Sequence, residues 1–355
     1  MKLLFNMRRC FVTLLPLLVL SIFIFSACSS NVKDDVEGSR ETKKMVWPDL
    51  PAKTRISLTS VVYKAKDLGI EKGFFRKVID FIGGEKELQL EKPMDVVVTP
   101  DGVIYVADPG AGGVHRFNKK ENEHVLLVRK DGRRMATPVG LAIGPGNSIL
   151  VSDSTLGVYQ IMPGQQYLTE AKLELQPRQG TGVAYDSNRK MLFVVDTLEH
   201  EVKIYNERYE LIGGIGKRGV GDGEFNFPTL VWVDYIGRIY VTDSLNFRVQ
   251  IFSPDGVYLR QFGKQGMGTG TQSRPKGVAT DNFGHIYVVD SLFHSVQVFD
   301  YRGRFLINFG SQGAGDGQFW LPTGIFIGGD TATTIYVADP FNKRVQVFEY
   351  VGGES

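Results

Sequence analysis

The chain has 355 residues, of which 43% are hydrophobic, and 41 basic residues nearly balance 39 acidic ones, giving a net charge of +2. This length permits one large domain or two ordinary ones. The balanced charge gives no indication of a nucleic-acid partner, so we predict none.

The first 27 residues have the organisation of an export signal. Lys2, Arg8 and Arg9 form a positive region, and an uncharged apolar run extends from Cys10 to Phe25. This run is short for a membrane-spanning helix and small residues follow it, which is typical of a secretory signal peptide. We therefore predict that the mature protein is exported.

The sequence FSAC at residues 25–28 resembles the lipobox of bacterial lipoproteins, with Phe25 where leucine is usual. The resemblance implies that residues 1–27 are a lipoprotein signal peptide and that Cys28 is lipidated. The expected product is a cell-envelope lipoprotein held on a membrane by its lipid, and Ser29 suits the outer membrane. The alternative is an ordinary signal peptide followed by an unmodified cysteine. Cys10 is lost with the signal, so no disulfide is expected and the core must hold the fold.

Two segments separate this signal from the repeats. Residues 28–53 are polar and charged and contain two prolines, which indicates a flexible tether. Residues 54–63, TRISLTSVVY, form a good candidate strand. In residues 71–82 the apolar side chains recur on one helical face, so we favour a short helix there over a strand.

From about Lys92 to Tyr350 the chain repeats one unit. Six apolar strands of the type VIYVAD end in aspartate, 43 to 49 residues apart. In most copies, Pro-x-Gly and an apolar run precede this strand. Two further strands follow it, such as RVQIF and GVYLRQFG, and turns rich in Gly, Asp and Pro separate the strands. Four-strand units with a period in the forties are typical of β-propeller blades. The aspartates are Asp108, Asp153, Asp196, Asp243, Asp290 and Asp339.

These units resemble the NHL repeat, most closely in DSLNFRVQIF, DSLFHSVQVF and DPFNKRVQVF. The resemblance implies an all-β fold, a six-bladed β-propeller with four-stranded antiparallel blades. Blade six lacks a fourth strand after VQVFEYVGGES, and an open edge would leave backbone groups unpaired. We therefore predict that Thr54–Tyr63 is the outer strand of blade six and closes the ring, so that residues 54–355 form a monomeric propeller. If residues 71–82 are a strand instead, that strand would close the ring and Thr54–Tyr63 would be an additional strand.

The repeated polar motifs favour structural roles over chemistry. An aspartate that ends a strand in every blade is expected to accept backbone N–H groups of the next loop. The glycine-rich connectors, such as GKRGVGDGEF, lack the helix and the Gly-Lys-Ser/Thr ending of a phosphate-binding loop.

Metal chemistry is not favoured either. His200 and His294 occupy equivalent positions in blades three and five and could hold zinc, as in amidating lyases built on this propeller, but histidine is common there in the repeat and no third ligand accompanies them. The residues expected at the channel mouth include no carboxylate, unlike calcium-dependent propeller lactonases. We assign no metal, no cofactor and no catalytic residue. We call the residues expected at the channel mouth the channel-mouth ring: Met94, Val139, Thr181, Thr229, Lys276 and Thr323.

The loops after the aspartates carry aromatic, aliphatic and cationic residues on one face, a mixture that suits recognition of a partner. We predict a non-enzymatic, envelope-anchored binding or scaffold module that recognises a protein, peptide or glycan there. One alternative is a propeller enzyme, a lyase or lactonase acting at the channel mouth; another is a structural component of a surface assembly. The leucines and phenylalanines of the rim could instead pack between blades. The candidate binding residues are Leu245, Asn246, Phe247, Arg248, Phe293, His294, Phe341, Asn342, Lys343, Arg344 and Lys276.

Overall fold

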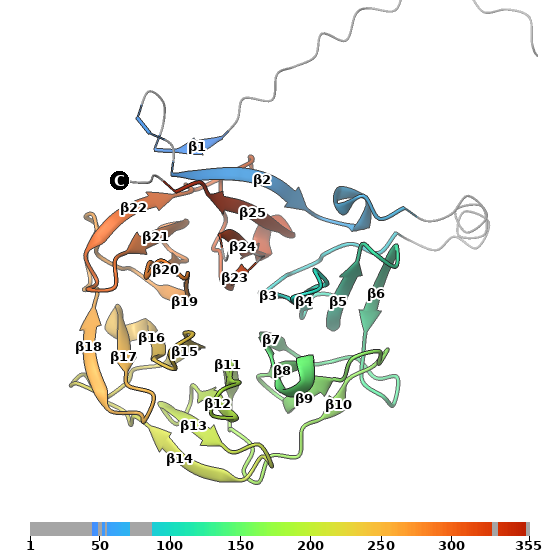
Figure 1. The fold of residues 1–355 in the computed structure, drawn as a ribbon, viewed down its shortest axis with the longest axis horizontal. Coiled ribbons are helices and arrows are strands. Elements are labelled where there is room, and N and C mark those ends of the chain that lie inside the picture. Colours follow the sequence, from blue (N-terminus) through green and yellow to red (C-terminus); the bar gives the residue numbers. More distant parts are fainter. Residues whose placement is uncertain (1–44, 49–51, 54, 72–86, 329–332, 353–355) are drawn as a thin grey trace, which may run out of the picture. The chain divides into compact units, whose positions relative to one another are not determined.

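The computed structural model describes residues 45–48, 52–53, 55–71, 87–328 and 333–352, all within one compact unit that spans Lys44–Ser355. The described chain forms six antiparallel sheets arranged as blades around an axis (Figure 1). The all-β, six-bladed propeller predicted from the repeats is confirmed. The signal peptide, Cys28 and the expected helix at 71–82 lie wholly or largely outside the described residues. No helix in the described ranges is long and apolar enough to cross a membrane.

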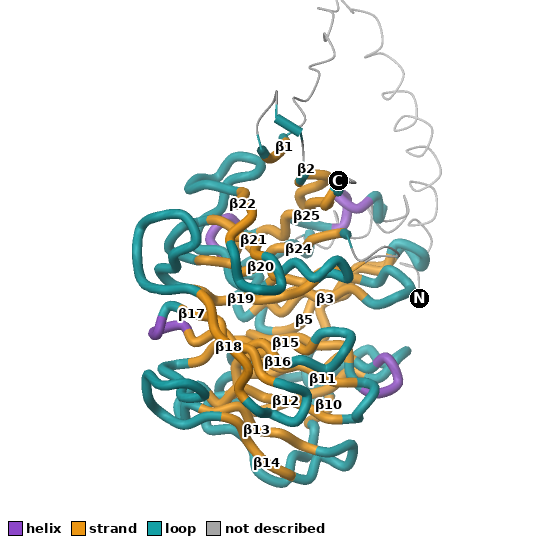
Figure 2. Tube along the Cα trace, turned by 60° about the vertical axis from the view of Figure 1, so that its left-hand side comes forward, coloured by secondary structure: helices purple, strands orange, loops and turns teal. Residues whose placement is uncertain are grey.

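Blades 1 to 5 are four-stranded sheets, blade 6 has a short fifth strand at its outer edge, and the first strand of each blade lies nearest the axis (Figure 1). Among the described residues, helix is confined to short 3-10 turns (Figure 2). Blades 1 and 2 comprise β3 (Asp95–Val98), β4 (Ile104–Asp108), β5 (Gly113–Asn118) and β6 (Glu123–Leu127), then β7 (Pro138–Ile143), β8 (Ile149–Asp153), β9 (Gly157–Ile161) and β10 (Thr169–Glu170). Blades 3 and 4 comprise β11 (Gly180–Asp186), β12 (Met191–Asp196), β13 (Glu201–Tyr205) and β14 (Leu211–Ile215), then β15 (Pro228–Val233), β16 (Ile239–Asp243), β17 (Arg248–Phe252) and β18 (Tyr258–Phe262).

Blades 5 and 6 complete the ring. They comprise β19 (Pro275–Thr280), β20 (Ile286–Asp290), β21 (Ser295–Phe299) and β22 (Phe305–Phe309), then β23 (Ile325–Gly328), β24 (Thr334–Asp339), β25 (Arg344–Tyr350) and β2 (Ile56–Val62), with β1 (Val46–Trp47) beyond β2. The 3-10 turns are η2 (Ala65–Leu68), η3 (Pro145–Asn147), η4 (Ser244–Asn246) and η5 (Pro340–Asn342).

The N-terminal strand closes the ring, as the sequence predicts. β2 pairs antiparallel with β25, from Ile56 opposite Tyr350 to Val62 opposite Val345. The open edge of blade 6 is thereby paired, which removes a site for aggregation. Because β2 lies far from β25 in the sequence, this pairing ties the two ends of the propeller together.

The predicted boundary between tether and propeller needs one correction. Val46–Trp47, which the sequence analysis assigns to the tether, forms β1 on the outer side of β2. The Trp47 ring lies 5.7 Å from that of Phe348 and 6.0 Å from that of Phe309, so it covers the junction of blades 5 and 6. Partial burial of the large Trp47 side chain explains why this part of the expected tether packs against the propeller.

The strand patterns explain which strands are central within each blade. The second strands β8, β16 and β20 are buried at every position, as their continuous apolar runs predict. The outer strands β18 and β22 alternate between more and less exposed residues, as expected for strands with one face toward solvent.

Large side chains fill the ring axis. Trp232 of β15 packs edge-on against Phe326 of β23, with ring centroids 6.1 Å apart, and its Nε1 donates to Thr280 Oγ1 of β19 at 3.0 Å. A cavity of about 20 Å³ beside them is lined by residues of five innermost strands, among them Asp95 and Leu141, which places it on the axis. Such a cavity holds about one water molecule. The space beside Trp232 and Phe326 therefore admits no ligand larger than a water molecule, which favours a ligand site at a face of the propeller.

Candidate functional site

One face of the propeller gathers the residues that the sequence analysis singles out. Pro228 pairs with Asp243 and Pro275 pairs with Asp290, so each innermost strand begins where the second strand ends. The loops after the aspartates, the connectors between blades and the channel-mouth ring therefore share this face. We call it the aspartate face.

The aspartates themselves hold the main chain. The Asp290 carboxylate accepts the backbone N–H groups of Ser273 at 2.7 Å, Arg274 at 3.0 Å and Phe293 at 3.1 Å. It is buried, and the other five aspartates likewise accept backbone N–H groups from the preceding connector. The aspartates thus have the structural role that the sequence predicts, but their main-chain donors come from the preceding connector in all six blades and from the following loop in blades 1, 2, 3 and 5.

The prediction that Arg248 and Arg344 belong to an exposed rim is wrong, because the two side chains are 6% and 0% exposed. Arg248 Nε donates to Asp243 Oδ2 at 2.7 Å, and its Nη2 donates to the carbonyl oxygens of Gly221 and Glu224, both at 2.8 Å. Arg344 makes the equivalent bonds in blade 6, so each guanidinium satisfies carbonyl groups of a glycine-rich connector that folds over it. A matching signal exists in the sequence, because an arginine follows the aspartate by five residues in both blades.

Asn246 and Asn342 also serve the connectors. Each side-chain Nδ2 donates to an aspartate, Asp243 or Asp339, at 2.8 Å, and to a connector carbonyl at 2.9 Å. Both side chains are half-buried, so these predicted binding residues shape the face more than they present free polar groups on it.

The two histidines join neighbouring blades. His200 Nδ1 accepts the N–H of Phe227 at 3.1 Å, and His294 Nδ1 accepts the N–H of Leu321 at 3.0 Å. Both residues have left-handed backbones, with φ of 57° and 52°, as do Phe247 and Lys343 at the same turn. The described residues contain no group of three or more His, Cys, Asp or Glu side chains that could hold a metal. The histidines thus orient the first residues of the next blade.

Large apolar side chains are exposed at the same position of four successive blades. Leu198, Leu245, Leu292 and Phe341 each follow the aspartate by two residues, with exposures of 45%, 39%, 48% and 57%. Blades 1 and 2 have Gly110 and Thr155 there. Phe227 and Trp320, which belong to connectors between blades, add to this surface with exposures of 36% and 47%. We call the set the apolar arc: Leu198, Phe227, Leu245, Leu292, Trp320 and Phe341.

The sequence analysis identified only part of this arc. Phe227 and Trp320 were missed, although large apolar residues in otherwise glycine-rich connectors are a usable signal. Phe247 and Phe293, which it did name, are only half-exposed. Phe341 lies under the Lys92 ammonium at 5.8 Å, and Lys343 pairs with Glu91 at 2.8 Å, so blade 6 also contacts the connector that leads to blade 1.

The channel-mouth ring contains one charged group, Lys276. Burial, together with the charge of Arg274, lowers the pKa of Lys276 to about 8. The threonines of the ring are already engaged: Thr323 Oγ1 donates to the Met94 carbonyl at 2.7 Å, and Thr229 Oγ1 donates to the Lys276 carbonyl at 3.1 Å. Lys276 is therefore the polar side chain of this ring that is available to a ligand.

Asp95 lies one residue beyond the ring and departs from the Pro-x-Gly pattern, as the sequence indicates. Its Oδ2 accepts the N–H of Leu141 in blade 2 at 2.8 Å, and its Oδ1 accepts the N–H of Val96 at 2.9 Å. Burial raises the pKa of Asp95 to about 7. Its carboxyl also fills the space beside Gly324, where a Cβ atom would lie only 2.2 Å from Oδ1. Asp95 thus fastens blade 1 to its neighbours.

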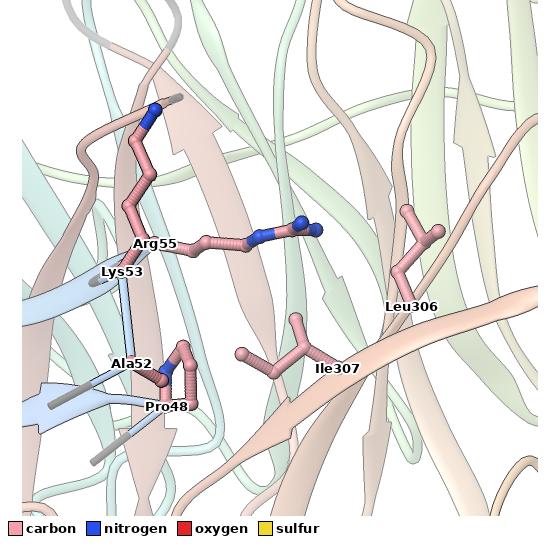
Figure 3. A pocket seen from close by; sticks show the side chains of 6 residues that line it. All are labelled: Pro48, Ala52, Lys53, Arg55, Leu306 and Ile307. Carbon is pink, nitrogen blue, oxygen red and sulfur yellow. The ribbon is translucent and has the colours of Figure 1, made fainter. Parts of the chain in front are cut away.

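A separate hollow of about 350 Å³ lies between the β1–β2 hairpin and β22. Arg55 extends across it toward Leu306 and Ile307 (Figure 3). The described lining offers no carboxylate, thiol or histidine, and residues 49–51 and 54 beside it lie outside the described residues. We therefore place the candidate site on the aspartate face.

Comparisons with known proteins identify the fold but no family. No protein-family model and no curated protein matches the chain. A solved structure of a protein of unknown function from Bacteroides thetaiotaomicron VPI-5482 has a TM-score of 0.60 at 14% identity, covering 83% of this chain and 75% of that one. An auxiliary nutrient-binding protein from the same organism has a TM-score of 0.58 at 12% identity, covering 74% and 70%.

A streptogramin B lyase has a TM-score of 0.55 at 11% identity, covering 73% of this chain and 94% of that one. At such identities the likeness shows the fold alone. Because a binding protein and a lyase share this fold with the chain, the site and not the fold must indicate the function.

Proposed function

We propose that the protein is a non-enzymatic binding module whose aspartate face takes up an apolar segment of a polypeptide partner. The observation that carries this proposal is the apolar arc. Four leucine or phenylalanine side chains repeat at one exposed position in consecutive blades, and Phe227 and Trp320 extend the same surface. Large exposed apolar side chains that gather on one face of a fold are typical of an interaction site.

The composition of the arc favours a polypeptide over a glycan. Three of its six members are leucines, which cover apolar side chains but cannot stack against sugar rings as aromatic side chains do. The amides beside it, Asn246 and Asn342, are occupied by connector carbonyls and aspartates and so offer little to sugar hydroxyls. Apolar anchors set among neutral contacts are the usual source of affinity in protein interfaces.

The same contacts speak against acid–base catalysis by the residues of this face. His200 and His294 each use Nδ1 to accept a backbone N–H, and the repeated aspartates are buried and accept hydrogen bonds from main-chain donors, joined by side-chain donors in blades 4 and 6. A general base needs free access to the proton it abstracts. A propeller enzyme and a component of a surface assembly remain the alternatives that the experiment must distinguish.

The experiment places a photo-crosslinking amino acid at Phe341, in the apolar arc, or at Phe283, which is exposed in the turn between β19 and β20 on the opposite face. We expect a discrete crosslinked polypeptide from position 341 in intact cells and none from position 283. Replacing both Leu245 and Leu292 by alanine should remove the adduct. Equal crosslinking from both faces, or an adduct that survives the double replacement, would contradict the proposal.

The lipobox-like sequence gives the module its expected location. We propose that Cys28 carries the lipid that holds the protein at the cell envelope, in the outer membrane of a host that has one. Stable anchoring requires more than one acyl chain, as lipoproteins carry. Wild-type protein should partition into the detergent phase of a Triton X-114 separation and Cys28→Ser should not; wild-type protein in the aqueous phase would refute the anchor.

A further inference from the structure

We propose that Lys276 anchors a carboxylate of the polypeptide partner, so that the aspartate face selects an apolar segment that contains an acidic residue. This inference rests on the proposed function and names the chemistry of its partner. It comes from the surroundings of the one charged side chain in the channel-mouth ring.

The main chain of Lys276 is fixed at the inner end of blade 5. Its carbonyl oxygen accepts hydrogen bonds from Thr229 Oγ1 at 3.1 Å and Thr242 Oγ1 at 3.0 Å, both in blade 4. The half-buried side chain stands among uncharged ring members, of which Thr229 and Thr323 belong to the flanking blades. A ligand group that reaches the mouth therefore meets a cation in a rigid, otherwise neutral setting.

Lys276 has no counter-ion among the described residues. The nearest strand-paired carboxylate is Asp290, opposite Pro275, and it accepts the backbone N–H groups of Ser273 and Arg274. Arg274 carries the same charge as Lys276, and His294 on the adjoining loop of blade 5 accepts the N–H of Leu321. No group packed against the Lys276 side chain thus neutralises it.

Three other cations of the aspartate face differ from Lys276 because each is paired with a carboxylate. Arg178 pairs with Glu199 at 2.6 Å, and Lys217 pairs with Glu224 at 3.4 Å. Lys343 pairs with Glu91, as described above. These carboxylates of the described residues are already committed, which leaves Lys276 open to an anion from another molecule.

The physical setting makes a carboxylate at this point effective. The Coulomb attraction within an ion pair is stronger away from bulk water than at an exposed surface, and desolvation of the incoming carboxylate offsets part of this gain. The lowered pKa of Lys276 agrees with an ammonium group that lacks such a partner. Trp232 and Phe326 close the axis beneath the ring, so the bound group stays at the mouth.

The same position links Lys276 to the apolar arc. Leu245, Leu292 and Trp320 belong to blades 4 and 5 and to the connector into blade 6, which surround the strand that carries Lys276. An extended peptide advances about 3.3 Å per residue, so a segment of a few residues can lay apolar side chains on the arc on either side of one acidic residue.

The test uses capped pentapeptide libraries with Leu, Phe or Val at the four outer positions and Glu, Gln or Lys at the centre. The purified protein is incubated with each library at low salt, and bound peptides are quantified by mass spectrometry. We expect at least about a tenfold preference for Glu over Gln, which corresponds to about 1.4 kcal/mol. Lys276→Met should lose this preference, Lys276→Arg should keep it, and Lys264→Met, at an exposed lysine of the same face, should leave it unchanged.

The outcomes separate this inference from the proposed function. Binding of all three libraries without a preference for Glu, or a preference that survives in Lys276→Met, would refute the carboxylate anchor and leave the peptide-binding module intact. Failure of every library to bind would refute both. The Glu preference of the wild type should also decline above pH 8 and that of Lys276→Arg should not, because only the lysine deprotonates there; a pH-independent wild type would contradict the assignment. Equal competition by inorganic phosphate would indicate a free-anion site instead.

Discussion

Asp95→Asn should make the protein more stable at neutral and alkaline pH while changing little in acid. The Asp95 carboxyl is 4% exposed, and burial raises its pKa from 3.8 to about 7. The folded state therefore holds the proton more tightly than the unfolded state, so the free energy of unfolding is highest below about pH 3.8 and falls as the pH rises to about 7. About three pKa units at 1.36 kcal/mol each give a loss of about 4 kcal/mol. Asparagine does not titrate and escapes this loss.

The assay is urea unfolding of the wild type and Asp95→Asn between pH 5 and pH 8. Asparagine has only one side-chain oxygen, so the variant cannot accept the backbone N–H groups of both Leu141 and Val96, and this loss lowers the free energy of unfolding by about 1 kcal/mol. We therefore expect its relative stability to rise by about 2 to 3 kcal/mol across this pH range, the part of the full effect that lies above pH 5. Val96→Ala is the control, because removing buried methyl groups destabilises equally at every pH. A difference between wild type and Asp95→Asn that is the same at pH 5 and pH 8 would refute the argument.

Lys276→Met should raise the free energy of unfolding at pH 7. This gain in stability should shrink as the pH rises from about 8 toward 10.5, because Lys276 loses its proton at a lower pH in the folded wild type than in the unfolded chain. Urea unfolding at pH 7 and pH 10 measures both effects. Arg344→Ala should cost about 3 to 5 kcal/mol, since it leaves a buried carboxylate unpaired, whereas Arg178→Ala in an exposed pair should cost less than about 1 kcal/mol by the same measurement. Deleting residues 29–63 removes β1 and β2 and should cause aggregation in light scattering, whereas deleting residues 29–43 should not; equal behaviour of the two truncations would disprove ring closure by β2.

The sequence by itself determined the architecture, because the local sequence pattern of each blade predicts its strands. Continuous apolar runs that end in aspartate, alternating outer strands and glycine-rich turns recur at a fixed period, and such units are stable only when they stack around an axis. The absence of a fourth strand at the end of blade 6 also predicted the closing strand. An unpaired sheet edge requires a partner, and a suitable strand precedes blade 1. The structural role of the six aspartates followed from the same repetition.

What lies on the surface was decided by tertiary structure. Arg248 and Leu245 sit on the same turn, yet the arginine points under a connector and the leucine points to solvent. A sequence position fixes the face of a blade but not whether the neighbouring connector folds over the side chain, because that depends on contacts with the next blade. The same reason explains why the sequence did not show that Trp232 closes the axis or that Lys276 lacks a counter-ion among the described residues. Local pattern sets the strands; packing between blades sets which side chains a partner can reach.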